Sequence, residues 1–380
     1  MQNSFSLSQP DPLQQIIDTL RGELLGLFQV QTVATQARGR VISFGGQLLY
    51  EPDTSYDEIS RRFLAHGYTP MLRREKGEDF VLAMEGVVDG KTGNPLLNLL
   101  LFLATILTTL YAGAALSGQD LVAAVLSESS FLITRAVLAG APFAVALLGI
   151  LGVHELGHYI AARLHGVRAT LPYFIPMPVG GLGTLGAFIA IKSPMKDRKV
   201  LFDIGLAGPI AGFVVALPLM VVGLLLSTEF VPSYINGQTL NSLGSSILSG
   251  FIIDIFTDIP AGRTLAIHPI FFAAWLGFYL TGINLLPVGQ LDGGHVTYAL
   301  LGRFAHIIAI AAFISLIAAG FLLHTNWFIW AFFILFGGLR HPPPLNDLSD
   351  IGWPRKLIGL MTVILFILII IPVPFLGNIF

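Results

Sequence analysis

Residues 136–163 read AVLAGAPFAVALLGILGVHELGHYIAAR, an apolar run that ends in a cluster of ionisable side chains. It is long enough to cross a bilayer as a helix, which takes about 20 residues. Similar stretches lie at 95–117, 203–227, 266–286, 304–323 and 357–378, and a shorter one lies at 325–339. Only 12% of the residues are charged, whereas soluble domains carry about a quarter, and mean hydropathy is +0.76. We therefore expect residues 93–380 to form a polytopic α-helical membrane domain with about seven transmembrane helices.

Residues 1–92 have a different character and predict a small soluble α+β domain. Their hydrophobic periodicity predicts helices at 12–28 and 56–66 and strands at 40–50, 68–73 and 79–84. The run 86–92, GVVDGKT, resembles a phosphate-binding loop but is one residue short of its spacing, so we expect no nucleotide. A net charge of −2 gives no basic field for nucleic acid.

The charges of the loops predict an orientation, because Lys and Arg concentrate on the cytoplasmic side. With seven spans, one set of loops holds only Arg135 and Arg263. The other set holds Arg168, Lys192, Lys196, Arg198, Lys199, Arg303, Arg340, Arg355 and Lys356. We therefore expect this second set, and residues 1–92 with it, to be cytoplasmic. The start, MQNSFSLSQPDPLQQ, resembles neither a secretory signal nor a transit peptide, which favours a bacterial inner or thylakoid membrane.

The sequence His154-Glu155-Leu156-Gly157-His158 predicts a metal site. Positions i and i+4 lie one above the other on a helix, so both imidazoles can reach one zinc ion. Glu155 stands beside them, where it can take a proton from a water molecule whose pKa the zinc lowers from about 16 to about 7. Ionisable groups are costly inside an apolar span and are rarely found there without a function.

A catalytic zinc site needs a third protein ligand, and the chain has no cysteine to provide it. The best candidate is Asp292, within the run 284–295, NLLPVGQLDGGH. Pro287 and the glycines break the preceding helix, and the predicted topology puts Asp292 on the same membrane side as the histidines. Taken alone, Asp292 also fits a turn residue or a helix cap.

Together, HELGH and NLLPxxxLDGG resemble the motifs of the site-2 protease family of intramembrane metalloproteases. The resemblance covers roughly residues 140–300, and we expect the protease core at 136–300. The resemblance implies a zinc metalloendopeptidase that cleaves membrane-protein substrates, single-pass or polytopic, in or near their transmembrane segments. It implies one Zn²⁺ per chain, held by His154, His158 and Asp292, with Glu155 as general base and Asn284 near the substrate. The soluble domain before the core is similar to the plastid and cyanobacterial branch named for ethylene-dependent gravitropism deficiency and yellow-green leaves.

Two further runs and one residue near these motifs suggest roles of their own. The glycine-rich run 178–191 predicts a hairpin whose edge, including Gly183 and Thr184, could receive an unwound substrate as an added strand, or else an ordinary loop. The run 205–212, GLAGPIAG, indicates close helix packing. His295 is a candidate partner for a metal ligand, or else has a surface or packing role.

Other function classes fit less well. A di-metal oxidase or desaturase needs several histidine clusters, and the chain has one. A metal transporter should carry acidic or histidine residues along several spans, and an inactive scaffold would be expected to lose a catalytic residue. A membrane-anchored HExxH peptidase of the soluble type would use a downstream glutamate as third ligand, but only Glu229 follows Glu155, on the predicted opposite side.

Overall fold

The computed structural model describes residues 11–376, apart from short gaps at 38–39, 88–89, 91–92, 179–180, 228–229, 233, 236–237 and 240–241. The chain forms two compact units. The first comprises Met1–Gly90, Ser193–Lys199 and Pro343–Ile351, and the second comprises Lys91–Lys192, Val200–Pro342 and Gly352–Phe380. Parts of the runs 86–92 and 178–191, and also Glu229, lie outside the described residues.

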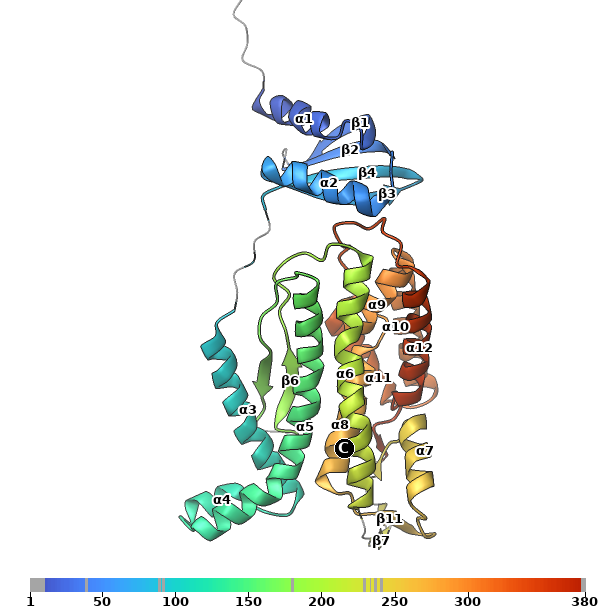
Figure 1. Ribbon diagram of the computed structural model, residues 1–380. Coiled ribbons are helices and arrows are strands. Elements are labelled where there is room, and N and C mark those ends of the chain that lie inside the picture. Colours follow the sequence, from blue (N-terminus) through green and yellow to red (C-terminus); the bar gives the residue numbers. More distant parts are fainter. Residues whose placement is uncertain are drawn as a thin grey trace, which may run out of the picture. The chain divides into compact units, whose positions relative to one another are not determined.

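The first unit contains a four-stranded antiparallel sheet with two helices on one face (Figure 1). Alternation along the strands turns Ile42, Phe44, Val81 and Ala83 to this face, where Phe63 of the second helix packs on them. The sheet order is β1-β2-β4-β3. The elements are α1 (Pro12–Glu23), β1 (Phe28–Gln36), β2 (Val41–Leu48), α2 (Pro52–Ala65), β3 (Tyr68–Glu75) and β4 (Glu78–Glu85). A small N-terminal sheet domain was predicted, but strand β1 was not.

Two segments from far along the chain extend this sheet beyond β3. Asn346 forms a parallel bridge to Leu72 of β3 and a second parallel bridge to Asp197. Leu345 and Leu348, on either side of Asn346, pack against the core of the sheet. The first unit is thus completed by segments that lie between the apolar helices in the sequence.

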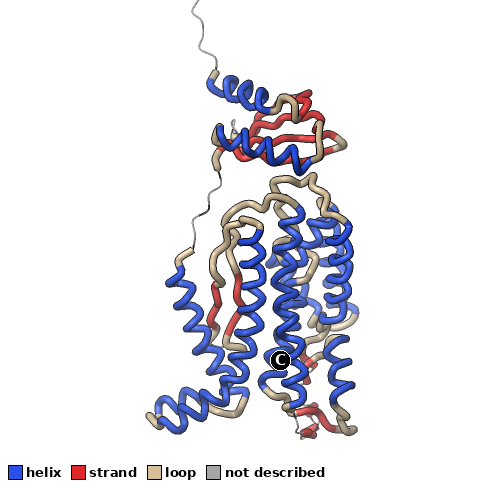
Figure 2. Tube along the Cα trace, in the orientation of Figure 1, coloured by secondary structure: helices blue, strands red, loops and turns tan. Residues whose placement is uncertain are grey.

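The second unit is mostly helical (Figure 2). Its helices are α3 (Pro95–Leu116), α4 (Leu121–Leu126), α5 (Ser130–Leu164), α6 (Arg198–Leu225, whose first two residues belong to the first unit), α7 (Ile247–Phe256), α8 (Pro269–Asn284), α9 (Asp292–Leu301), α10 (Phe304–Leu322), α11 (Trp327–Gly337) and α12 (Trp353–Ile369). Its strands are β5 (Tyr173–Pro176), β6 (Thr184–Phe188), β7 (Phe230–Pro232), β8 (Tyr234–Ile235), β9 (Gln238–Thr239), β10 (Ser242–Leu243), β11 (Arg263–Leu265) and β12 (Phe375–Leu376).

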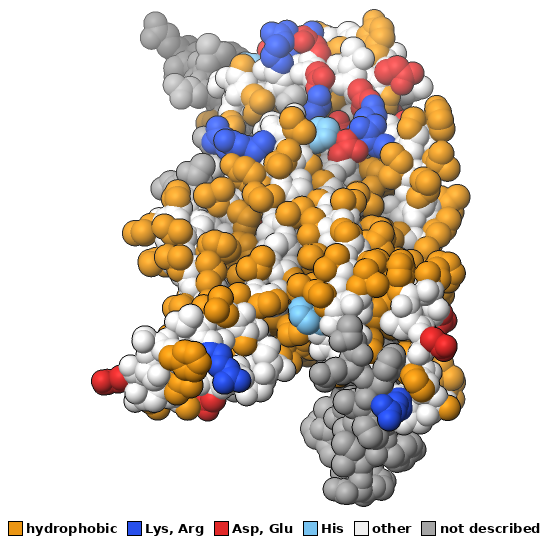
Figure 3. All heavy atoms as spheres, turned by 60° about the horizontal axis from the view of Figure 1, so that its bottom comes forward, with side chains coloured by type: hydrophobic (Ala, Val, Ile, Leu, Met, Phe, Trp, Pro, Cys, Tyr) orange, Lys and Arg blue, Asp and Glu red, His pale blue; other side chains and the backbone are white. Residues whose placement is uncertain are grey.

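Four helices among the described residues are long and apolar enough to cross a membrane: α3, α5, α6 and α10. Each coincides with a predicted span. Helices α8, α11 and α12 stand at the other three predicted positions, but with 16, 11 and 17 residues they are shorter. The count of seven therefore stays a prediction. On the face shown in Figure 3, hydrophobic side chains cover much of the surface of the helices. Leu99, Leu103 and Leu107 of α3 are exposed.

Close helix contacts and one hairpin shape the interior of the second unit. A Cβ on Gly113 of α3 would lie 2.4 Å from the carbonyl oxygen of Gly140 of α5, so these two helices touch through their backbones. The antiparallel pair β5–β6 lies beside α3 and α5 (Figure 1). A hairpin was therefore correctly predicted for the run 178–191, with β6 as its second strand.

Candidate metal centre

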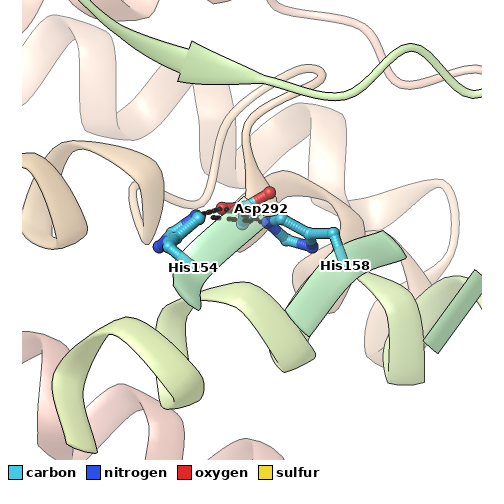
Figure 4. A group of neighbouring side chains, drawn as sticks. All are labelled: His154, His158 and Asp292. Carbon is cyan, nitrogen blue, oxygen red and sulfur yellow. Dashed lines mark hydrogen bonds and ion pairs between the residues drawn. The ribbon is translucent and has the colours of Figure 1, made fainter. Parts of the chain in front are cut away.

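Three ionisable side chains converge in the second unit (Figure 4). His154 and His158 come from α5, one turn apart, and Asp292 comes from the first position of α9. The two Nε2 atoms are 3.2 Å apart, and Asp292 Oδ2 lies 3.3 Å from the Nε2 of His154 and 3.2 Å from that of His158. Both histidines are buried. These are the three side chains that the sequence predicted as metal ligands, and together they could hold a metal ion.

The spacing of the three atoms fits a metal ion. Around a tetrahedral zinc ion with bonds of about 2.0–2.2 Å, two ligand atoms lie about 3.3 Å apart. The observed separations of 3.2–3.3 Å agree with that value. Two imidazoles and a carboxylate are also ligands that zinc accepts, and three of them leave a fourth position open for a water molecule. The donor set therefore fits the predicted cofactor.

A backbone contact selects the tautomer of one ligand. His158 Nδ1 lies 2.7 Å from the carbonyl oxygen of Ile204 in α6. A carbonyl oxygen only accepts hydrogen bonds, so Nδ1 carries the proton and donates it. The lone pair of this neutral imidazole is then on Nε2, which faces His154 and Asp292. Such an outer contact is typical of histidines that bind metals.

Glycines of α6 make room for the two imidazoles. A Cβ on Gly208 would lie 2.1 Å from His158 Nε2, and a Cβ on Gly212 would lie 3.1 Å from His154 Nδ1. The sequence interpretation assigned this run only to helix packing. In the structure the two glycines also lie directly against the imidazoles of His158 and His154. Their spacing of four residues, equal to that of the histidines, was the available signal.

The turn between α8 and α9 brings Asp292 to the histidines. Helix α8 ends at Asn284, and α9 begins at Asp292 after a turn that contains Pro287. A Cβ on Gly293 would lie 2.1 Å from the carbonyl oxygen of Leu285. The glycine after the aspartate is therefore needed because α9 packs directly on the backbone of the turn.

Glu155 lies next to the metal ligands and next to the hairpin. Its side chain is buried, and it forms a hydrogen bond with the backbone of Ile189, the residue after β6. A small cavity opens beside it. The cavity is lined by Ile150, Leu151, His154, Glu155, Leu185, Gly186, Ala187, Gly277, Leu280, Thr281 and Asn284. The sequence had pointed to His154, Glu155 and Asn284 and to the run 178–191, which contains Ile189. It had given no site role to the other lining residues, Ile150, Leu151, Gly277, Leu280 and Thr281.

The residues predicted to meet substrate lie in two different surroundings. Asn284 lines the cavity, with Nδ2 3.3 Å from His154 Nε2. Gly183 and Thr184 are not among the lining residues. The Gly183 carbonyl accepts a hydrogen bond from Thr108 Oγ1 of α3 at 2.6 Å, and Thr184 Oγ1 donates to the Ile175 carbonyl at 2.9 Å. Both therefore hold the hairpin in place, and their role in substrate binding stays a prediction.

Comparison with known proteins places these motifs in a family. The Peptidase family M50 model matches residues 142–324, which contain the histidines, Glu155 and Asp292. The chain is 36% identical to probable zinc metalloprotease EGY1, chloroplastic, of Arabidopsis thaliana over 62% of this chain and 43% of that one. The corresponding protein of Oryza sativa subsp. japonica is also 36% identical, over 61% and 40%.

Another relative matches nearly the whole chain. Probable zinc metalloprotease EGY2, chloroplastic, of Arabidopsis thaliana is 27% identical over 95% of this chain and 66% of its own length. The chain thus spans less than two thirds of each of these relatives. No solved structure matches. Residues 142–324 are thus similar to peptidase family M50, and the predicted resemblance to site-2 proteases and to their plastid branch is confirmed.

Proposed function

We propose that this chain is a zinc metalloendopeptidase that hydrolyses peptide bonds in or near the transmembrane segments of membrane proteins. One observation carries the proposal. Three ligand atoms lie 3.2–3.3 Å apart beside a buried glutamate, and two of the ligands belong to a helix long and apolar enough to span a membrane.

His154, His158 and Asp292 would hold one zinc ion. The ion would supply a Lewis acid that lowers the pKa of a water molecule and polarises the scissile carbonyl. Glu155 takes the proton of the water molecule as its oxygen attacks the carbonyl carbon. Glu155 then delivers the proton to the amide nitrogen as the C–N bond breaks. The amide of Asn284 is placed to donate a hydrogen bond to the oxygen that gains charge.

The hairpin would present the substrate. A peptide bond inside a helix is shielded, so a substrate helix has to be extended before cleavage. Strand β6 ends beside Glu155, and Leu185, Gly186 and Ala187 line the cavity. An extended peptide that pairs with β6 would therefore pass the glutamate. Gly183 and Thr184 would help to bind the substrate through their part in this hairpin.

The setting of the enzyme completes the proposal. Residues 93–380 would span the bilayer about seven times, with α8, α11 and α12 as spans besides the four candidates. Residues 1–92 would form a soluble domain on the cytoplasmic side, in a bacterial inner or thylakoid membrane. The partners would be the lipid bilayer and single-pass or polytopic substrates, with no nucleic acid and no nucleotide.

Cleavage of candidate membrane helices by the purified full chain in detergent tests the function. We expect cleavage that requires zinc and is lost in Glu155→Gln, which keeps the shape of the side chain but removes the base. Glu128→Gln, the same change at an exposed glutamate between α4 and α5, is the matched control. Undiminished cleavage by Glu155→Gln would contradict the proposal.

A further inference from the structure

Two histidines outside the metal cluster form a close pair in the second unit. His295 lies in the first turn of α9, and His341 lies in the segment after α11. His295 Nδ1 and His341 Nε2 are 2.5 Å apart, and the rings stand at 85° to one another. The ring of Tyr298 stacks on His341, with centroids 4.8 Å apart. His341 lies outside the residues that the family model matches.

The two rings of this pair share a hydrogen bond. Burial lowers the pKa of His295 and that of His341, so both imidazoles are neutral at neutral pH. A neutral imidazole has one N–H and one lone pair, so one ring donates to the other. A neutral hydrogen bond between buried groups contributes about 0.5–1.5 kcal/mol. The pair therefore joins α9 to the segment around residue 341.

Helix α9 depends on such contacts for the position of its first turn. Its N-cap residue, Leu291, makes no capping hydrogen bond through its side chain, so the usual local support is missing. His295 stands three residues after Asp292 and therefore on the same side of the helix. On that side α6 approaches closely, because a Cβ on Gly205 would lie 2.6 Å from His295 Cβ and 3.3 Å from the Asp292 carbonyl oxygen.

The segment that carries His341 is itself anchored. His306 Nδ1, on α10, lies 2.9 Å from the carbonyl oxygen of Leu339. A continuous series of contacts thus runs from α10 through this segment to His295 and the first turn of α9. Neither His295 nor His341 belongs to the group of side chains that could hold the metal.

We propose that His341 is a positioning residue for Asp292: through its hydrogen bond to His295 it holds the first turn of α9 so that the carboxylate meets the two histidine ligands. This inference rests on the proposed zinc site. It adds a residue from outside the matched family region to the support of the metal centre. It predicts that loss of the pair weakens zinc binding without removing a ligand.

Zinc affinity of the purified full chain, measured by competition with a chromophoric chelator, tests the inference. We expect His341→Ala to raise the zinc Kd about 2- to 10-fold, the factor that corresponds to the loss of this one hydrogen bond. His295→Ala should have a similar effect, and the double variant should be no worse than either single one. His341→Gln, which keeps a hydrogen-bonding tip, should recover part of the affinity. The visible spectrum of the Co²⁺-substituted protein should change in both alanine variants, because the carboxylate shifts.

Two further variants keep the test decisive. His324→Ala, at an exposed histidine after α10, should bind zinc like the wild type. His341→Phe retains a ring against Tyr298 but lacks the hydrogen bond, so it gives an answer even where His341→Ala does not fold. Wild-type affinity and an unchanged cobalt spectrum in folded His341→Phe would overturn the inference alone. The proposed function would be overturned if the wild-type chain binds no zinc, or if His154→Ala binds zinc as tightly as the wild type.

Discussion

Gly208 stands directly against the metal-facing nitrogen of His158. A Cβ on this glycine would lie 2.1 Å from Nε2 and 2.4 Å from Cδ2 of the imidazole, far inside van der Waals contact. The opposite ring nitrogen is fixed by its hydrogen bond to Ile204, so the ring cannot turn away without losing that bond. The imidazole of His158 therefore fits only because residue 208, on helix α6, is a glycine.

We expect Gly208→Ala to abolish most of the activity. The methyl group would push Nε2 by roughly 1 Å, and a displacement of that size in an active site can lower the rate about 100-fold. Gly212→Ala should be milder, since its Cβ would lie 3.1 Å from His154 atoms, which requires a shift of only a few tenths of an ångström. Zinc content after gel filtration and the cleavage rate would measure both effects.

The control for these variants is Gly149→Ala in α5, where a Cβ would meet nothing within 4 Å. Alanine favours helix over glycine by about 0.5–1 kcal/mol, so this variant should be fully active and no less stable. Equal activity in Gly149→Ala and Gly208→Ala would mean that Gly208 does not shape the site.

Asp292→Asn should weaken zinc binding by more than about tenfold. Loss of a residue that hydrogen-bonds to a metal ligand already lowers affinity by about tenfold or more, and loss of a charged ligand itself should cost at least as much. The amide keeps the shape of the side chain, so the fold should be preserved. Asp258→Asn, at an exposed aspartate after α7, should have no effect. Zinc titration of the purified variants gives the comparison. Full affinity in Asp292→Asn would remove Asp292 from the ligand set.

Thr108→Val should slow cleavage while leaving zinc affinity unchanged. The Thr108 hydroxyl holds the Gly183 carbonyl at 2.6 Å, and the loss of one such bond costs about 0.5–1.5 kcal/mol. If the hairpin presents the substrate, that cost should appear as a rate about 2- to 10-fold lower.

Thr105→Val is the matched control for this change, because among the described residues the Thr105 hydroxyl donates only to the Leu101 carbonyl of its own helix. A loss of zinc in Thr108→Val, or equal slowing in Thr105→Val, would show that the hairpin contact has no specific role.

Local sequence was enough to predict most of the metal site. The spacing of His154 and His158 is a property of one helix, and Pro287 with the glycines marks the turn that leads to Asp292. The helical positions followed from apolar runs, since hydrophobic length decides which segments can enter a bilayer.

Features that join distant segments could not be predicted in this way. Strand β1 was missed because most of its residues are exposed and because its apolar-polar alternation, Phe28 to Gln31, ends at the register shift between Val30 and Thr32. The pair of His295 and His341 depends on how α9 meets the segment after α11, which no local period encodes. The extension of the sheet by residue 346 likewise depends on segments that are far apart in the sequence.

Asn346 is the contact that closes the first unit, and its loss should destabilise that unit. The residue is fully buried. Its Nδ2 lies 3.3 Å from the Pro52 carbonyl oxygen and 3.2 Å from Asp53 Oδ1, and its Oδ1 accepts from Leu348 N at 3.2 Å. Asn346→Ala removes three hydrogen bonds to partly buried partners and the packing of a buried side chain, which together should cost about 1–3 kcal/mol. The same free energy would raise the equilibrium constant for local opening of the unit by about 5- to 150-fold. Hydrogen exchange of the β3 amides should be faster by that factor.

The ion pair of Lys196 and Asp57 in the same unit provides the contrast. Its atoms are 2.7 Å apart, but its side chains are 46% and 60% exposed. Exposed pairs contribute about 0–1 kcal/mol because water and salt screen the charges. Lys196→Ala should therefore change exchange in β3 much less than Asn346→Ala does. Equal acceleration of exchange in the two variants would show that the Asn346 side chain does not hold the added segments on the sheet. The backbone pairing at residue 346 would then hold them alone.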